Sequence, residues 1–304
     1  MSDRRDVEAV AVIGAGSVGC MLAAHLASAG HHIVVCGRAR LERVAMTIDE
    51  VSVEHEVAWA EGPADLPLLR HAVLATKIHH TPDVAGWLGA LPPGGVLVAA
   101  QNGIDHRARL APMTSAAVVP TLVYPNARRT GPGQVRVTRT GRGIVVPDDE
   151  AGRTAAALFA GSGIDVEEVA DFPTAAWDKL LVNVMANPLT ALTGRPTGEL
   201  FDEPAMAALG LELALETVEV ARAEGAALTP QHAREALAWL QGLPGHLSTS
   251  MLQDRDAGRT MEHVGLLSPV VTLGEHHGVP TPVTRAVLAL LDALPVAGPG
   301  GGVS

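Results

Sequence analysis

The sequence has few cysteines and lacks long apolar runs, and each of these absences excludes a class of protein. Its 304 residues include only Cys20 and Cys36, and both lie in segments that we expect to be buried. Two buried thiols indicate a reducing compartment rather than a disulfide framework, so we expect a cytoplasmic protein. No run of about 20 apolar residues is free of polar breaks, so neither a membrane-spanning helix nor a membrane partner is predicted.

The sequence also lacks the patterns of metal centres, nucleic-acid binding and secretion. The 13 histidines are scattered, and their adjacent pairs lack zinc-like spacing to other ligands, so no metal site is predicted. The net charge of −11 argues against nucleic acid as a partner. Acidic residues precede the first apolar stretch and a glycine motif interrupts it, which argues against a signal peptide.

The length and the hydrophobic content favour two domains. A chain of 304 residues, 47% of them hydrophobic, is long enough to form two cores. Near residue 170 the pattern changes from mixed strands and helices to helices alone. We therefore predict a first domain of strands and helices over 1–170, a helical second domain over 171–296, and a flexible tail over 297–304.

A strand, a glycine-rich turn and a helix follow one another near the N-terminus. Residues 8–13 form a short β-branched apolar run typical of a buried parallel strand, and the small apolar residues 20–29 predict a helix. Between them, Gly14 permits a tight turn, Gly16 lets the backbone approach a pyrophosphate, and Gly19 allows close helix–strand packing. The helix N-terminus offers N–H groups to the phosphates, although a purely structural turn is the alternative. The predicted cofactor-binding residues of this turn are Gly14, Ala15, Gly16, Ser17, Val18 and Gly19.

The end of the second predicted strand, 33–36, indicates which dinucleotide is bound. NAD-binding proteins place an acidic residue near this position to bond the ribose 2′-hydroxyl. Here Arg38 and Arg40 stand there, and the first acidic residue is Glu42. A guanidinium suits a 2′-phosphate in charge and geometry, so the sequence favours NADP(H) over NAD(H), with a solvated arginine as the alternative.

Two further buried strands are predicted at 71–76 and 95–100. In a doubly wound sheet, ligands bind beyond the carboxyl ends of the strands, and Lys77 and Asn102 are placed there. Lys77 is a candidate for cofactor phosphate or adenine, and Asn102 for the nicotinamide ribose or the substrate. The alternatives are a solvated lysine and a turn-forming Asn-Gly pair.

The remaining segments complete the first domain and form an all-helical second one. Alternation over 133–147 around residues 140–143 predicts a β-hairpin that closes the first domain, and Thr174 is a candidate cap for the next helix. Strands are expected at 117–124 and 164–169, and helices at 151–160, 174–192, 204–224, 230–241, 259–277 and 281–293. The predicted fold is α/β: an N-terminal Rossmann-type doubly wound sheet with a C-terminal helical domain like that of 6-phosphogluconate dehydrogenase. Several dehydrogenases with this frame bind substrate between their domains.

One predicted helix carries polar residues in an otherwise apolar stretch. Lys179, Asn183 and Asn187 are spaced at i, i+4 and i+8, which stacks them on one face. Burying such groups without partners costs several kcal/mol, so a bound polar substrate is one candidate partner. The alternative is a polar stripe that faces solvent.

These residues and several segments of the second half resemble the ketopantoate reductase (2-dehydropantoate 2-reductase) family almost end to end. The glycine loop is the least specific part of the match, whereas the segments from Lys179 to Leu192 and around Ser250 are much more specific. The matching positions are 14–19, Arg38, Lys77, 101–103, 177–180, Asn183, 187–192, 250–254, 258–259, Glu262 and 278–282.

The resemblance implies an activity and a role for each matching residue. The family reduces the keto group of ketopantoate with NADPH and yields pantoate for pantothenate and coenzyme A synthesis. Lys179 matches the general acid, Glu262 matches the acid that orients the lysine and the substrate, and Asn102 matches a residue near the nicotinamide and the substrate. The residues that match those holding the substrate's hydroxyl and carboxylate are Asn183, Asn187 and Ser250. The expected partner is a small keto acid, with a homodimer as a possible assembly.

The sequence departs from the family pattern after Glu262. Val264 replaces an acidic residue, 267–269 replace an Asn-Gly pair, and Met261 interrupts the usual run into the glutamate. A paralogous NADP-dependent oxidoreductase of this fold, acting on another 2-keto acid or ketone, is therefore the alternative function. A non-catalytic NADP(H) sensor is a third hypothesis, but such a protein does not need the lysine and the two asparagines.

Overall fold

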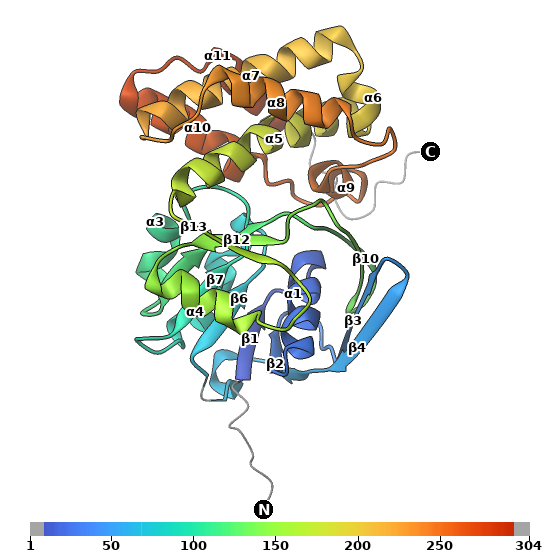
Figure 1. Cartoon of the computed structure of the whole chain (residues 1–304), viewed down its shortest axis with the longest axis vertical. Coiled ribbons are helices and arrows are strands. Elements are labelled where there is room, and N and C mark those ends of the chain that lie inside the picture. The colour runs from blue at the N-terminus through green and yellow to red at the C-terminus, as the bar shows by residue number, and fades with distance from the viewer. Residues whose placement is uncertain (1–8, 68, 295–304) are drawn as a thin grey trace, which may run out of the picture. The chain divides into compact units, whose positions relative to one another are not determined.

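The computed structural model describes residues 9–67 and 69–294, and the predicted tail at 297–304 lies outside these ranges. The chain divides into two compact units with a boundary between Phe172 and Pro173 (Figure 1). The first unit contains the strands and the second is helical. Within the described residues, no helix is both long enough and apolar enough to cross a membrane.

A six-stranded parallel sheet forms the centre of the first unit. Its order is β5-β2-β1-β6-β7-β8, and every neighbouring pair is parallel. The order reverses beside β1, so the carboxyl ends of β1 and β6 flank the position where dinucleotides bind in doubly wound sheets. The strands are β1 (Ala9–Ile13), β2 (His32–Cys36), β5 (Ala58–Ala60), β6 (His71–Leu74), β7 (Val96–Ala99) and β8 (Ala117–Pro120).

Alternating side chains of this sheet supply two hydrophobic cores. Val10 and Val12 of β1 pack in the cluster that includes most of α1 (Ser17–Ser28), whereas Ala11 and Ile13 pack in a cluster on the opposite face. The second cluster includes α2 (Ala85–Gly89) and α3 (His106–Leu110). The two cysteines are buried free thiols, one in each cluster, as the sequence predicted. This two-faced burial confirms the predicted doubly wound α/β fold.

The predicted hairpin at 133–147 is wrong. The hairpin is formed by β10 (Asn126–Gly131) and β11 (Gln134–Thr138), and it turns at Gly133, where φ is +69°. It extends a second sheet of order β10-β11-β3-β4, which packs over α1 and includes β3 (Arg43–Ile48) and β4 (Val51–Glu56).

The glycine-rich residues 140–143 connect two sheets instead of reversing a hairpin. β12 (Ile144–Pro147) pairs with β9 (Leu122–Val123) and with β13 (Val166–Val169). A Cβ atom at Gly143 would lie 2.0 Å from the carbonyl oxygen of Asp165. That glycine therefore marks a close approach of two chain segments, which sequence spacing alone cannot distinguish from a turn.

Between Pro173 and Leu294 every regular element is a helix (Figure 1). α5 begins at Phe172, so Thr174 is not its cap; its Oγ1 accepts a hydrogen bond from the backbone N–H of Ala227 instead. α10 begins at His263 rather than at residue 259, and the short helices α6 and α9 were not predicted. The helices are α5 (Phe172–Thr193), α6 (Thr197–Phe201), α7 (Pro204–Ala223), α8 (Pro230–Gln241), α9 (Ser250–Asp256), α10 (His263–His277) and α11 (Pro282–Asp292).

Candidate active site

The glycine loop between β1 and α1 has the geometry of a dinucleotide cradle. Gly14 has φ +104°, and a Cβ atom there would lie 2.8 Å from the backbone nitrogen of Thr76. A Cβ atom at Gly19 would lie 1.8 Å from the carbonyl oxygen of Gly14. A Cβ atom at Gly16, by contrast, would meet nothing within 4 Å. The first and third glycines are thus required by packing, whereas the second keeps open space in front of the backbone.

The start of α1 fits the binding of an anion. Its N-cap residue is Gly16, no side chain caps the helix, and its first turn contains no acidic residue. Ala15 and Val18 pack against the core, so this loop would contact a ligand through backbone groups rather than through those side chains. Uncapped N–H groups and the partial positive charge of the helix end suit a pyrophosphate.

Arg38 follows β2 and is exposed. Within the described residues it makes no hydrogen bond or ion pair, whereas Arg40 pairs with Glu42 at 3.4 Å. Of these two arginines, Arg38 is therefore the one whose guanidinium remains available to a phosphate group.

Lys77 and Asn102 lie at the carboxyl ends of β6 and β7, and both are half-buried. The buried side chain of Gln101 joins the two strand ends, because its Nε2 donates a hydrogen bond of 2.9 Å to the carbonyl oxygen of Thr76. Sequence reasoning did not single out Gln101, although it stands directly before Asn102.

In the second unit, Lys179 lies on α5 between the buried residues Trp177 and Leu180. Lys179 is half-buried, and desolvation lowers the pKa of its ammonium group from 10.5 to about 8. Desolvation disfavours the charged form, so the ammonium group is a stronger acid than an exposed lysine. Such a shift is what a lysine needs to donate a proton near neutral pH.

The two asparagines of α5 form a pair on the same helix face. The Nδ2 of Asn187 donates a hydrogen bond of 3.3 Å to the Oδ1 of Asn183. Asn187 is buried and Asn183 is half-buried. This bond uses one donor of the first amide and one acceptor of the second, and other hydrogen-bonding positions on both groups remain.

Two threonines that were not predicted continue this polar face toward Ser250. The Oγ1 atoms of Thr190 and Thr249 are 2.7 Å apart. Thr249 caps α9 by accepting from the N–H of Leu252, and Ser250 is the exposed first residue of that helix. Ser250 is thus one residue from a direct contact with the polar face of α5. The position of Thr190, three residues after Asn187, was a signal that sequence reasoning could have used.

Glu262 is buried, with 7% of its surface exposed, and stands directly before α10. The N-terminus of a helix stabilises a carboxylate at that position. Two residues after Glu262 that differ from the family pattern have different surroundings. Val264 is 52% exposed, whereas Leu267 is fully buried in the helical unit. A leucine at position 267 therefore suits the apolar core of this unit.

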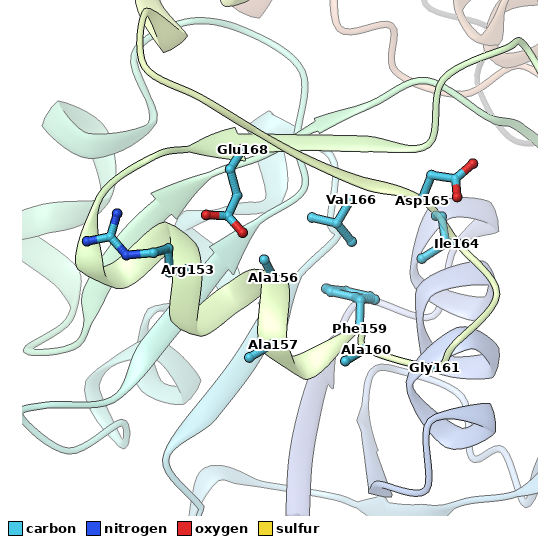
Figure 2. A pocket seen from close by; sticks show the side chains of 10 residues that line it. All are labelled: Arg153, Ala156, Ala157, Phe159, Ala160, Gly161, Ile164, Asp165, Val166 and Glu168. Carbon is cyan, nitrogen blue, oxygen red and sulfur yellow. The ribbon is translucent and has the colours of Figure 1, made fainter.

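A separate hollow of about 420 Å³ lies between α4 (Glu150–Leu158) and β13 (Figure 2). Alanines of α4 and of the segment that follows it line the hollow, and Arg153, Asp165 and Glu168 are its charged lining residues. None of the predicted site residues lines this hollow.

Two family models match the chain in succession. The model "Ketopantoate reductase PanE/ApbA" matches residues 10–149, and "Ketopantoate reductase PanE/ApbA C terminal" matches residues 171–295. Together they cover nearly all of the described residues.

Curated relatives and solved structures agree with these models. The chain is 37% identical to the 2-dehydropantoate 2-reductase of Caulobacter vibrioides over 93% of its own length and 98% of the relative's. It is 34% identical to the Mycobacterium tuberculosis enzyme of the same name, over 93% and 97%. A PanE/ApbA family ketopantoate reductase from Ralstonia eutropha superposes with a TM-score of 0.85, at 28% identity, over 93% of this chain and 97% of that one. The chain therefore belongs to the ketopantoate reductase (PanE/ApbA) family.

Proposed function

We propose that this protein is an NADPH-dependent reductase that converts 2-dehydropantoate (ketopantoate) to pantoate. The observation that carries the proposal is Lys179, a half-buried lysine whose pKa desolvation lowers to about 8, on the helix face that also holds Asn183 and Asn187. The names of the curated relatives give the substrate. A paralogous activity on another keto acid is not favoured, because these relatives share one named activity.

When bound, NADPH supplies a hydride to the carbon of the keto group, and the electron pair of the C=O bond moves to the oxygen. Lys179 then donates a proton from Nζ to that oxygen, which completes the hydroxyl group of the product. A cation beside the oxygen also stabilises the negative charge that develops there. The lysine recovers its proton from solvent, because a group with a pKa near 8 is mostly protonated at pH 7.

The neighbouring side chains bind and orient the substrate in this proposal. Asn183, Asn187 and Ser250 hold its hydroxyl and carboxylate groups, and Glu262 orients the lysine and the substrate. The amides and the serine hydroxyl can each donate a hydrogen bond to an anion, which suits a carboxylate.

The first unit binds the cofactor in this proposal. The backbone of residues 14–19 receives the pyrophosphate, Arg38 the 2′-phosphate, Lys77 a phosphate or the adenine, and Asn102 the nicotinamide ribose. Arg38 suits this role because it is exposed and no described residue pairs with it. A charge-assisted bond from guanidinium to phosphate then selects NADPH over NADH.

The oxidation of NADPH, followed at 340 nm with purified protein and ketopantoate, tests the proposal. We expect kcat/KM of about 10⁴ M⁻¹s⁻¹ or more, with much slower turnover when NADH replaces NADPH. Tight NADPH binding without turnover would exclude ketopantoate and would direct a panel of other 2-keto acids at the same protein.

We further propose that the enzyme is cytoplasmic, acts on small molecules without nucleic acid or membrane, and forms a homodimer. One structural neighbour is described as a dimeric ketopantoate reductase from Staphylococcus aureus, with 25% identity and a TM-score of 0.82 over 94% of this chain and 98% of that one. Light scattering coupled to size-exclusion chromatography gives the molar mass directly, and a value near 31.4 kDa would exclude the dimer.

A further inference from the structure

We infer that Arg109 and Gln101 form a positioning network that holds the glycine loop and Lys77 in the geometry that binds the cofactor. The inference rests on the proposed use of NADPH. Neither residue belongs to the glycine loop or to the proposed substrate-binding set, and the network is built entirely within the first unit.

The amide of Gln101 can adopt only one orientation. Its Nε2 donates to the carbonyl oxygen of Thr76 at 2.9 Å and to the Oγ1 of Thr81 at 3.0 Å. Its Oε1 accepts from the Nη1 of Arg109 at 2.8 Å. A carbonyl oxygen can only accept and a guanidinium can only donate, so a flipped amide would lose both bonds.

The guanidinium of Arg109 is itself fixed. Its Nε donates to both carboxylate oxygens of Asp105, at 3.2 and 3.3 Å. Its Nη1 also reaches the Oγ1 of Thr81 at 3.3 Å. Its Nη2 is buried and finds no acceptor among the described residues. A buried donor without a partner is destabilising, which argues that this arginine is kept for placement rather than for stability alone.

The network ends on the glycine loop. Thr76, which Gln101 holds, packs so closely on Gly14 that a Cβ atom there would lie 2.8 Å from the Thr76 backbone nitrogen. Ala75 packs in the same way against Gly19, at 3.3 Å from a Cβ built there. Residues 75 and 76 thus pack directly against the glycine loop, so a shift of Thr76 would move both that loop and the adjacent Lys77.

The same network fixes the strand end that carries Asn102. The backbone carbonyl of Gln101 lies 2.7 Å from the Nε2 of the buried His106, and its side chain is held as described above. Both the main chain and the side chain of the residue before Asn102 are therefore anchored. Loss of Arg109 leaves the Oε1 of Gln101 without its donor, so the amide is held from the Nε2 side alone and the ends of both β6 and β7 are less firmly anchored.

The chain offers a matched control on the same helix. Arg107, two residues before Arg109 on α3, also pairs with an aspartate, Asp149, at 2.6 Å. Its side chain is 55% exposed, against 16% for Arg109, and makes no bond to Gln101. Arg107→Met thus removes an arginine–aspartate pair from the same helix without touching the network.

The test is NADPH binding, measured by fluorescence titration without substrate, together with steady-state kinetics and the unfolding temperature of each variant without cofactor. We expect Arg109→Met to raise the Kd and the KM for NADPH about 5- to 10-fold. A change of this size corresponds to the loss of one charge-assisted bond. The value of kcat should change less than about twofold. Gln101→Glu should raise them at least as much, because a carboxylate oxygen would face the Thr76 carbonyl. Arg107→Met should leave both within about twofold of the wild type.

Equal Kd values for the wild type and Arg109→Met would overturn the inference, even if the variant unfolds at a lower temperature. A merely structural network moves the unfolding temperature alone. If Arg109→Met does not fold, Thr81→Val serves instead, because it removes one hydroxyl from the same network and should raise the Kd for NADPH about threefold. An unchanged Kd in the Thr81→Val variant would equally overturn the inference. If the wild type itself binds no NADPH, the proposed cofactor is wrong and the inference falls with it.

Discussion

The two units present their functional groups in different ways. In the first, the cradle is made of backbone: Gly14, Gly16 and Gly19 matter because they lack side chains, and the helix end offers N–H groups. In the second, the candidate chemistry belongs to side chains on one face of a largely buried helix. A backbone cradle depends on local geometry and appears as a motif, whereas the reactivity of Lys179 depends on the desolvation of its ammonium group in the folded chain.

The two units also share a rare residue type, because each contains one of the two lysines of the chain. Lysine and arginine together number 22, yet only two are lysines, Lys77 in the first unit and Lys179 in the second. A guanidinium stays charged at any ordinary pH, whereas an ammonium group can give up its proton when burial lowers its pKa. In a chain that uses arginine at nearly every cationic position, the rarity of lysine is itself a sequence signal for these two sites.

The largest effect should come from Lys179→Ala. Without the general acid, kcat should fall by about 10²–10⁴, while the Kd for NADPH changes little because the cradle lies in the other unit. Stopped-flow turnover and NADPH titration measure the two quantities separately. Arg222→Ala, which removes an exposed cation of α7, is the control. Near-normal turnover of the lysine variant would refute its catalytic assignment.

Arg38→Met should change the choice of cofactor. Removing a charge-assisted bond to the 2′-phosphate should lower the ratio of kcat/KM for NADPH to that for NADH by about 10- to 100-fold. Arg40→Met, whose arginine already pairs with Glu42, should lower the ratio far less. If the two variants behave alike, Arg38 is not the phosphate ligand.

Gly16→Ala should weaken the binding of NADPH without changing the stability of the fold. A Cβ there meets nothing in the protein, so the unfolding temperature should not change, but the methyl group would occupy space that the pyrophosphate needs. We expect NADPH affinity to fall about tenfold, the result of losing about 1.4 kcal/mol. Gly89→Ala, whose Cβ lies no closer than 3.8 Å to other atoms, is the control. Unchanged NADPH affinity would place the phosphates elsewhere.

The pH dependence of reduction should report the pKa of Lys179. With a pKa of about 8, the protonated fraction and therefore kcat should fall roughly tenfold between pH 7 and pH 9. Reductive ¹³C-methylation labels only two lysines and the N-terminal amine, so NMR titration can follow each signal, and Lys179→Arg identifies the relevant one. A signal that titrates near 10.5 would contradict the burial argument.

The stability of the folded state should also depend on the protonation of Lys179, and it should rise with pH where kcat falls. The pKa of Lys179 is lower in the folded protein than the usual 10.5, so the unfolded chain binds more protons between pH 8 and pH 10.5 and the stability of the folded state rises across that window. Below pH 8 the burial of the ammonium costs about 3 kcal/mol at most. Urea unfolding should therefore show Lys179→Met to be more stable than the wild type at pH 7, with the difference shrinking toward pH 10.5. A constant difference would show that burial of the charge is not the cause.

Short-range patterns were enough to predict much of the fold. The run of strand, glycine turn and helix at residues 9–28 and the long helix containing Lys179 depend on spacing within a few residues. The errors lie where distant segments compete. Gly143 approaches Asp165 and Thr174 bonds to Ala227, contacts that no local pattern encodes. The start of α10 was misplaced because the N–H of Arg259 bonds back to Asp254 instead of beginning the helix.

The sequence by itself determined the family, the α/β architecture, the glycine turn after β1, the presence of an arginine after β2 and the polar spacing along α5. These features depend on residue type and on spacings of two to eight positions, which the backbone geometry of strands and helices converts directly into shared faces. Only the tertiary structure decided that Gln101 is locked between Thr76 and Arg109, and that Thr190 meets Thr249 across 59 residues. It also decided the acidity of Lys179, because burial depends on every segment packed around a side chain, not on the neighbours that the sequence lists beside it.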